Sequence, residues 1–112
     1  DIFLMPSKYE PCGLNQMYSM RYGAVPVVRA TGGLADTVRE FNPETREGTG
    51  FRFVPYDSFN FSEAIARALR YWENAEHWRC IISNGMQSDF SWARSAARYA
   101  EVYENVQKRR QF

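Results

Sequence analysis

In the first half of the chain, short runs of apolar residues alternate with stretches whose apolar positions follow helical spacing. Three of the short runs, each flanked by Gly, Thr or Pro, predict strands at about 2–5, 24–28 and 50–54. The first run has no polar position between its apolar ones and stops at a Pro-Ser turn signal, which favours a fully buried strand. We therefore expect the chain to begin inside a fold.

Two stretches between the predicted strands have the pattern of helices. Residues Leu14 to Tyr22 predict the first, and Gly23 suits the left-handed position that follows many helix ends. Residues Leu34 to Glu40 predict a second, shorter helix. Alternating strands and helices are typical of a parallel sheet with right-handed crossovers, as in doubly wound α/β domains. With three strands, the sequence predicts half of a Rossmann-like sheet.

The second half of the chain predicts only helices, each with an apolar stripe that we expect to face the core. The stripes are Phe61, Ile65, Ala68, Leu69 and Trp72; Trp78, Ile81, Ile82 and Met86; and Trp92, Ala96, Tyr99, Tyr103 and Val106. The last helix begins near Ser91 and ends in cations at 108–110, which suit the negative end of its dipole. The predicted organisation is one partial domain, with strand–helix repeats over 1–56 and a helical end over 57–112.

Composition and charge narrow the classes of function. The 112 residues are 45% hydrophobic and 16% aromatic, enough for a core, and 14 Lys and Arg nearly balance 13 Asp and Glu. This balance gives no reason to expect a nucleic-acid partner. The apolar runs are far shorter than the roughly 20 residues of a membrane span, and no signal-like segment precedes them. We expect a soluble intracellular protein.

Two smaller sequence features have alternative interpretations. Cys12 and Cys80 lack metal-ligand spacing and form no disulfide framework, so we expect two free thiols and no metal site. The triplet at 60–62 fits a glycosylation pattern. However, Asn60 followed three residues later by Glu63 also fits a helix-capping arrangement, which we favour without a secretory signal.

The stretch from Pro6 to Tyr18 places a carboxylate and a glycine loop between a predicted strand and a predicted helix. Ligands of open α/β sheets bind at this edge, and the N–H groups that start the helix favour phosphate. Gly13 would let the backbone approach a ligand, and Glu10 could accept hydrogen bonds from sugar hydroxyls. The residues thus indicate a sugar with a phosphate. The alternative, that Glu10 caps the helix and Gly13 only makes a turn, stays open on this reasoning.

A second glycine loop, Thr31-Gly32-Gly33, follows the second predicted strand and opens the next helix. Such a loop can bind an anion or can simply allow close helix packing. We interpret it as an element that lines the ligand cleft, and its contact with the ligand stays open.

Several segments together resemble the starch and bacterial glycogen synthases. They are 5–18, 20–23, 25–29, 31–38, 48–51 and 89–92, the last two with the sequences Gly-Thr-Gly-Phe and Asp-Phe-Ser-Trp. The resemblance implies a retaining glycosyltransferase with two Rossmann-like domains, the GT-B fold, and an active site between them. It also implies that this chain is a carboxyl-terminal fragment, the later part of the second domain.

The resemblance assigns roles to residues of the first glycine loop. Glu10 matches the family's carboxylate that contacts the glucose of ADP-glucose, so it is the candidate catalytic residue. The backbone amides of Cys12 and Gly13 match positions that bind glucose hydroxyls. Those of Leu14 and Asn15 match positions that face the diphosphate, as the helix-dipole argument also suggests.

Three other side chains receive weaker assignments. Tyr18 lies where many related transferases have a second Glu, so we expect it to contact the nucleotide less strongly than Glu10 contacts the sugar. The thiol of Cys12 has no His near it in sequence, and we expect only its backbone to act. His77, the only histidine, is expected to pack or to lie on the surface.

The chain lacks other parts of the family's active site, which include an upstream Arg and Lys and a Lys-x-Gly-Gly-Leu loop. We therefore expect a fragment of an α-1,4-glucan synthase that is inactive alone and needs its missing amino-terminal part. The expected ligands of the complete enzyme are ADP-glucose and α-1,4-glucan, with no cofactor, in the cytoplasm of a bacterium or a plastid of a plant. The alternatives are a non-catalytic nucleotide-sugar-binding module and a protein-interaction module, including self-association through an exposed sheet edge.

Overall fold

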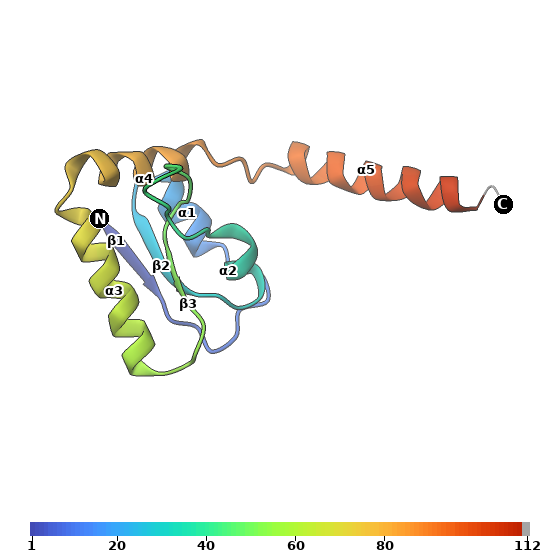
Figure 1. Cartoon of the computed structure of the whole chain (residues 1–112). Coiled ribbons are helices and arrows are strands. Elements are labelled where there is room, and N and C mark those ends of the chain that lie inside the picture. The colour runs from blue at the N-terminus through green and yellow to red at the C-terminus, as the bar shows by residue number, and fades with distance from the viewer. Residues whose placement is uncertain (111–112) are drawn as a thin grey trace.

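The computed structural model describes residues 1–110 as three strands interleaved with and followed by helices (Figure 1). In chain order the elements are β1 (Ile2–Met5), α1 (Asn15–Arg21), β2 (Val25–Arg29), α2 (Gly32–Thr37), β3 (Phe51–Phe53), α3 (Ser58–Trp72), α4 (Ala75–Gln87) and α5 (Trp92–Arg109).

The strands form one parallel sheet in the order β1-β2-β3. In register, Leu4 of β1 lies opposite Val27 of β2, which lies opposite Phe51 of β3. Parallel neighbours require crossover connections, and here these contain α1 and α2. The predicted parallel α/β sheet is confirmed.

Each face of the sheet has its own apolar core. On one face Val27 packs with Phe51 and with Ile81 of α4, in a cluster that also contains residues of α3. On the other face Val28 packs with Leu34 of α2 and with a residue of α1. Since neighbouring β2 side chains point to opposite faces, this central strand is buried on both sides. The arrangement is three layers, with α3 on one side of the strands and α2 on the other (Figure 1).

Helix α2 is displaced from the predicted range, because it begins at Gly32 rather than at Leu34 and ends at Thr37 rather than at Glu40. Val38 adopts an extended conformation, and Glu40 forms a parallel bridge with Gly50, just before β3. Val38 is also fully buried in the core that Leu34 joins. The β-branched Val38 and the pairing with the next strand's approach favour extended backbone here over another helical turn.

The start of α3 also differs from the sequence prediction. The residue that caps this helix is Asp57, whose carboxylate accepts a hydrogen bond from the Asn60 amide at 2.7 Å. Asn60 is therefore inside the helix rather than at its cap, and it is the donor that the Asp57 cap satisfies. At the end of α1, in contrast, Gly23 has a φ of +83°, as predicted.

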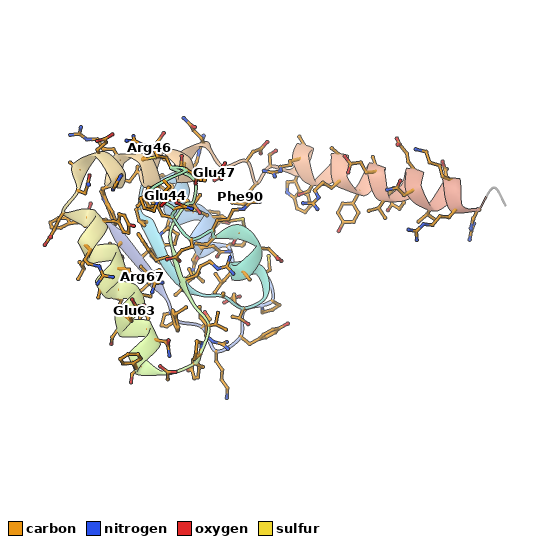
Figure 2. All side chains as sticks on the ribbon, in the orientation of Figure 1. Glu44, Arg46, Glu47, Glu63, Arg67 and Phe90 are labelled. Atoms are coloured by element: carbon orange, nitrogen blue, oxygen red, sulfur yellow. The ribbon has the colours of Figure 1, made fainter. Side chains whose placement is uncertain are left out.

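Arg67 on the partly exposed face of α3 links that helix to the sheet. Its guanidinium forms ion pairs with Glu63, one helical turn away, and with Glu40. It also donates a hydrogen bond of 2.7 Å to the carbonyl of Arg52 in β3. Figure 2 shows Glu63 and Arg67 on the same side of α3. Although half-exposed pairs contribute little, the bond to the β3 carbonyl fixes the position of α3 on the sheet.

Parts of the predicted core are exposed in this chain. Strand β1 is not fully buried, since it is an edge strand and Leu4 is 45% exposed. In the helical stripes, Leu69, Trp72 and Met86 are also exposed. These side chains lie where residues 1–110 provide no further strand or helix to cover them.

Helix α5 departs most from the prediction, because none of its residues is buried. Trp92 is 87% exposed, and the other four members of its stripe are exposed as well. The helix extends away from the sheet (Figure 1). This raises the radius of gyration to 16.4 Å, against about 13 Å for a compact chain of this length. Within residues 1–110, no helix has both the length and the apolar character needed to cross a membrane.

Candidate active site

Two loops meet at the carboxyl edge of the sheet, and both contain glycine. Loop 1, residues 6–14, follows β1 and leads into α1. Loop 2, residues 30–33, follows β2 and includes the first turn of α2. Because the carboxyl ends of neighbouring parallel strands lie at one edge, the loops are neighbours in space. This is the edge at which the sequence predicted a ligand site.

The backbones of the two loops touch. The Gly33 amide donates hydrogen bonds to the carbonyls of Glu10, at 3.0 Å, and of Pro11, at 3.1 Å. A Cβ atom on Gly33 would lie 1.9 Å from the Cys12 carbonyl oxygen, and one on Gly32 would lie 2.0 Å from that of Glu10. Only glycine permits this approach, so loop 2 supports loop 1 directly. Whether Thr31, Gly32 and Gly33 also line a ligand cleft stays a prediction.

The amides of loop 1 predicted to bind the donor are free. Among residues 1–110, no hydrogen bond engages the backbone N–H of Cys12, Gly13, Leu14 or Asn15. Leu14 is the N-cap of α1 and supplies no side-chain cap, so the helix begins with unpaired donors. These consecutive amides could donate to oxygen atoms of a ligand. Because α1 has only seven residues, direct hydrogen bonding matters more here than a helix dipole.

Glu10 lies beside these amides with its side chain partly exposed. Within the described chain, no hydrogen bond or ion pair engages its carboxylate, and it does not cap α1. A Cβ on Gly13 would lie 3.0 Å from Glu10 Cγ, so the Glu10 side chain lies against the glycine. The capping alternative for Glu10 is therefore wrong. A carboxylate next to free amides can accept from a hydroxyl while the amides donate.

Gln16, which the sequence analysis did not identify, supports loop 1 from the interior of the protein. Its side chain is fully buried, and Nε2 donates to the carbonyls of Cys12 at 3.3 Å and Gly13 at 3.0 Å. Nε2 also donates to Oγ1 of Thr37 in α2, at 3.0 Å. The available signal was the position of Gln16 four residues before the apolar Met20, on the buried face of a helix.

Arg29, at the end of β2, joins the three strand ends and was also missed. Its guanidinium donates to the carbonyl of Lys8 in loop 1 and, at 2.9 Å, to that of Val54 after β3. It lies over the Tyr56 ring, 5.5 Å from the centroid. Arg29 therefore links loop 1 to the segment that follows β3 at this edge of the sheet.

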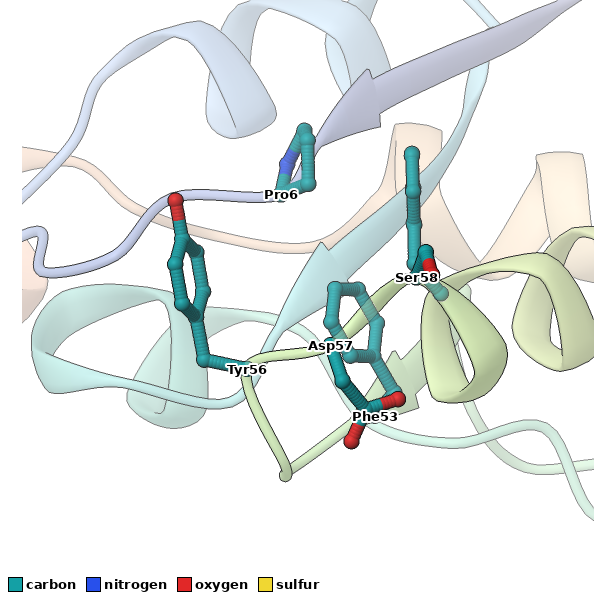
Figure 3. Close-up of a pocket in the computed structure, with 6 residues that line it drawn as sticks. Pro6, Phe53, Tyr56, Asp57 and Ser58 are labelled. Atoms are coloured by element: carbon teal, nitrogen blue, oxygen red, sulfur yellow. The ribbon is translucent and has the colours of Figure 1, made fainter.

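One cavity lies at this edge, and a second runs along α1. One, of about 370 Å³, lies between the end of β1 and the start of α3, and Figure 3 shows Pro6, Phe53 and Tyr56 in its wall. None of the predicted site residues lines it. The other, of about 520 Å³, lies along α1 and is lined by Leu14 and Tyr18 together with residues 88–92. The structure thus brings two predicted substrate-binding residues beside the Asp-Phe-Ser-Trp segment.

Asp89, which begins this segment, is fixed by its own neighbours. Hydrogen bonds from the hydroxyl and the amide of Ser91 hold the pKa of the Asp89 carboxyl below its ordinary value. Ser91 in turn caps α5 by accepting from the Arg94 amide. The carboxylate therefore stabilises the connection into α5 and is ionised at neutral pH.

The remaining chemically notable side chains are the two cysteines and the histidine. Cys12 is exposed in loop 1 and Cys80 is partly buried, and both are free thiols, as predicted. His77 packs against the rings of Phe41 and Tyr71, with centroids 5.8 and 5.7 Å away, which is the first of the two roles predicted for it. In the described part of the chain, no group of three or more acidic, His or Cys side chains could hold a metal ion.

Comparison with known proteins supports the resemblance indicated by the motifs. The family described as glycosyl transferases group 1 matches residues 1–82. Glycogen synthase of Thermotoga petrophila is 58% identical over 107 residues, which cover 95% of this chain and 22% of that protein. Glycogen synthase of Pseudothermotoga lettingae is 50% identical over 113 residues, covering 100% and 23%. The chain thus spans less than a quarter of the relatives it matches.

Solved structures agree. The catalytic domain of starch synthase IV from Arabidopsis thaliana, bound to ADP and acarbose, has a TM-score of 0.82 and 40% identity, covering 94% of this chain and 22% of that one. Sucrose-phosphate synthase from Thermosynechococcus elongatus has a TM-score of 0.64 and 30% identity, covering 96% and 25%. The predicted fold class, part of a GT-B glycosyltransferase, is confirmed, as is the resemblance to starch and glycogen synthases. This chain belongs to the glycosyl transferases group 1.

Proposed function

We propose that this chain forms the donor-sugar side of an active site that transfers glucose from ADP-glucose to the non-reducing end of an α-1,4-glucan, with retention of configuration. The observation that carries the proposal is the set of free amides at 12–15 next to the Glu10 carboxylate, which accepts no hydrogen bond within residues 1–110. A sugar nucleotide needs both kinds of group, because its hydroxyls donate and accept while its phosphates only accept.

The proposed roles follow from the positions of the groups. Glu10 accepts from a hydroxyl of the donor glucose, and the amides of Cys12 and Gly13 donate to glucose oxygens. The amides of Leu14 and Asn15 donate to the diphosphate, whose departure they assist by stabilising the charge that develops on it. The ADP bound to the similar starch synthase supports a donor in which the sugar is linked to ADP.

Tyr18 belongs to the same proposed site but has a weaker role. Its side chain is 56% exposed and lies with Leu14 in the wall of the larger cavity. A ring in this position could pack against the nucleotide. We propose a contribution to donor affinity rather than to the chemical step.

The chain requires further residues for turnover. Departure of a diphosphate needs cationic groups, and Arg29 does not serve, since its guanidinium is bound to backbone carbonyls. We propose that the 112 residues form part of the carboxyl-terminal nucleotide-sugar-binding domain of a longer protein. The remaining part supplies the cations and the acceptor side. The exposed apolar residues of β1 and α5 fit a surface that this part covers.

The test uses the complete protein that contains this chain. Purified protein is incubated with a glycogen primer and either ADP-glucose or UDP-glucose, and the linkage and anomeric configuration of the product are read by NMR. We expect α-1,4-linked glucose from ADP-glucose, with a much smaller kcat/KM for UDP-glucose. A β-linked product, or turnover of neither donor, would contradict the proposal.

A further inference from the structure

Two of the three hydrogen-bond partners of the buried Gln16 side chain are carbonyls of loop 1, which leads into its helix. Nε2 has three acceptors, the carbonyls of Cys12 and Gly13 and Oγ1 of Thr37, for its two hydrogens. Oε1 is buried and has no partner among the described residues. A buried unpaired oxygen is unfavourable, but the reverse orientation would aim Oε1 at two carbonyl oxygens. The carbonyls therefore fix which way the amide points.

Thr37 connects Gln16 to loop 2. Its hydroxyl donates to the Gly33 carbonyl at 2.7 Å, which leaves its oxygen to accept from Gln16. The Gly33 amide, in turn, donates to the carbonyls of Glu10 and Pro11. The hydrogen bonds thus form a closed circuit that runs from loop 1 through Gly33, Thr37 and Gln16 and returns to loop 1.

This circuit determines the direction of the loop 1 amides. In a trans peptide, the C=O of one residue and the N–H of the next point in opposite directions. Holding the carbonyls of Pro11, Cys12 and Gly13 toward the protein turns the following amides, those of Cys12, Gly13 and Leu14, away from it. These are three of the four free amides at 12–15.

We infer that Gln16 and Thr37 are positioning residues for the sugar nucleotide: Gln16 holds the peptide planes 12–13 and 13–14 directly, and Thr37 holds Gly33, which bonds the Pro11 carbonyl, so that the N–H groups that follow face the donor. The inference rests on the proposed function for the identity of the ligand. Neither side chain is placed to touch the donor, because Gln16 is fully buried behind the loop and the Thr37 hydroxyl is bonded to Gln16 and to the Gly33 carbonyl. Gly13 permits this packing, since a Cβ there would lie 2.7 Å from Gln16 Oε1.

The kinetic test uses the complete protein and two pairs of variants. Gln16→Met keeps the length of the side chain and removes the donor, and Thr37→Val removes the hydroxyl that Thr37→Ser retains. We expect Gln16→Met and Thr37→Val to lower kcat/KM for the nucleotide sugar by about 10-fold to 100-fold, with an unchanged KM for the glucan primer. Thr37→Ser should restore most of the activity. The Gln16→Met/Thr37→Val double variant should lose less than the product of the single losses.

A matched control separates positioning from stability. Ile81→Val shortens a buried side chain of the α3 and α4 core and should lower Tm without changing the KM of the donor. Donor kinetics of Gln16→Met equal to those of the wild type would overturn the inference. So would a loss of activity that follows Tm equally in Gln16→Met and Ile81→Val. If Gln16→Met does not fold, the comparison of Thr37→Val with Thr37→Ser decides.

A crystal structure of the Gln16→Met protein tests the same inference without turnover. At least one of the peptide planes 12–13 and 13–14 should be turned relative to the wild type, and an unchanged loop 1 would overturn the inference. A wild-type protein that uses no nucleotide sugar would instead overturn the proposed function, while this structural comparison would still show whether Gln16 orients the loop.

Discussion

The Glu10 carboxylate stands beside a row of backbone donors and has no competing partner within residues 1–110. Replacing it by Gln keeps the shape but removes the charge, so Glu10→Gln in the complete protein should lower kcat for glucosyl transfer by at least about 100-fold. Tm should change little, because the carboxylate makes no internal bond. Glu44→Gln, at an exposed position, is the matched control and should retain activity (Figure 2). Near-normal turnover by Glu10→Gln would contradict its assignment.

The neighbouring Cys12 should behave differently, although it lies in the same loop. Only its backbone amide is proposed to bind the donor. Among residues 1–110, the hydrogen bond of its exposed thiol is a weak one of 3.7 Å to the Gly13 carbonyl. Cys12→Ser should therefore keep kcat/KM within about threefold of the wild type, as measured by the same transfer assay. A total loss with an unchanged fold would indicate thiol chemistry.

Glycine has a steric role at position 33. Gly33→Ala would place a Cβ 1.9 Å from the Cys12 carbonyl oxygen, which neither backbone can avoid, and should destabilise the protein by more than about 3 kcal/mol. Gly85→Ala is the control, since its Cβ would meet Met20 Cβ at 3.3 Å, and a small relative movement of α1 and α4 relieves this contact. Its effect should stay within about 1 kcal/mol. Equal losses in chemical denaturation would contradict the contact between the loops.

At the level of single residues, the sequence identified exposed site residues better than buried ones. Glu10 and Gly13 stand in a motif whose types and spacing indicate sugar and phosphate binding. Gln16 could not be found in this way, because a Gln within a predicted helix is ordinarily exposed. Its burial depends on Thr37, 21 positions later, and on a contact between two loops that no local pattern specifies.

Among the secondary-structure elements, α3 is capped at its N-terminus by a charged side chain, the Asp57 carboxylate. Hydrogen bonds from the amide and the side chain of Asn60 hold the pKa of the Asp57 carboxyl below its ordinary value of 3.8. A folded-state pKa below the unfolded one means that the ionised cap stabilises the fold above pH 3.8, and that this stabilisation is lost as the pH falls through the folded pKa. Asp57→Asn keeps an acceptor without the charge. The wild type should have the higher Tm at pH 7, and the difference should shrink below pH 3.8. A constant difference would contradict the prediction.

Strands and helices were predictable where local pattern and tertiary environment agree. The strands and α1 follow from apolar runs and from Gly23, whose positive φ ends the helix in the expected place. The end of α2 was not predictable, since a β-branched residue such as Val38 does not by itself end a helix. The backbone leaves the helix at Val38 because Glu40 forms a parallel bridge with Gly50, which lies 10 residues later in the sequence.

For the molecule as a whole, the exposed apolar surface predicts association of the isolated chain. Leu4 at the sheet edge and the stripe of α5 lie open to solvent, and burying a few hundred Å² would contribute several kcal/mol at about 25 cal/mol per Å². Sedimentation of residues 1–112 should show self-association, and calorimetry should show weak binding of ADP-glucose at most. A stable monomer with micromolar affinity would contradict this expectation.

A truncated chain separates the two surfaces. Residues 1–91 retain β1 and lack α5, so loss of association would place the contact on the helix, and persistence would place it on the sheet. The sequence pattern identified an apolar stripe on α5. It could not show whether another part of this chain covers that stripe, because an apolar stripe does not specify the surface that packs against it.

The strand order also bears on how the chain opens and refolds. Each strand pairs with the strand next to it in sequence. Forming the sheet therefore requires closure of only the two crossover connections, and the entropic cost of closing a connection grows slowly with its length. Local opening is least favourable at β2, which is buried on both faces, and easiest at α5, which buries nothing. Amide exchange should accordingly be slowest in β2. A protease that meets the isolated chain would cut first around α5 and leave the sheet with loop 1 as the resistant core.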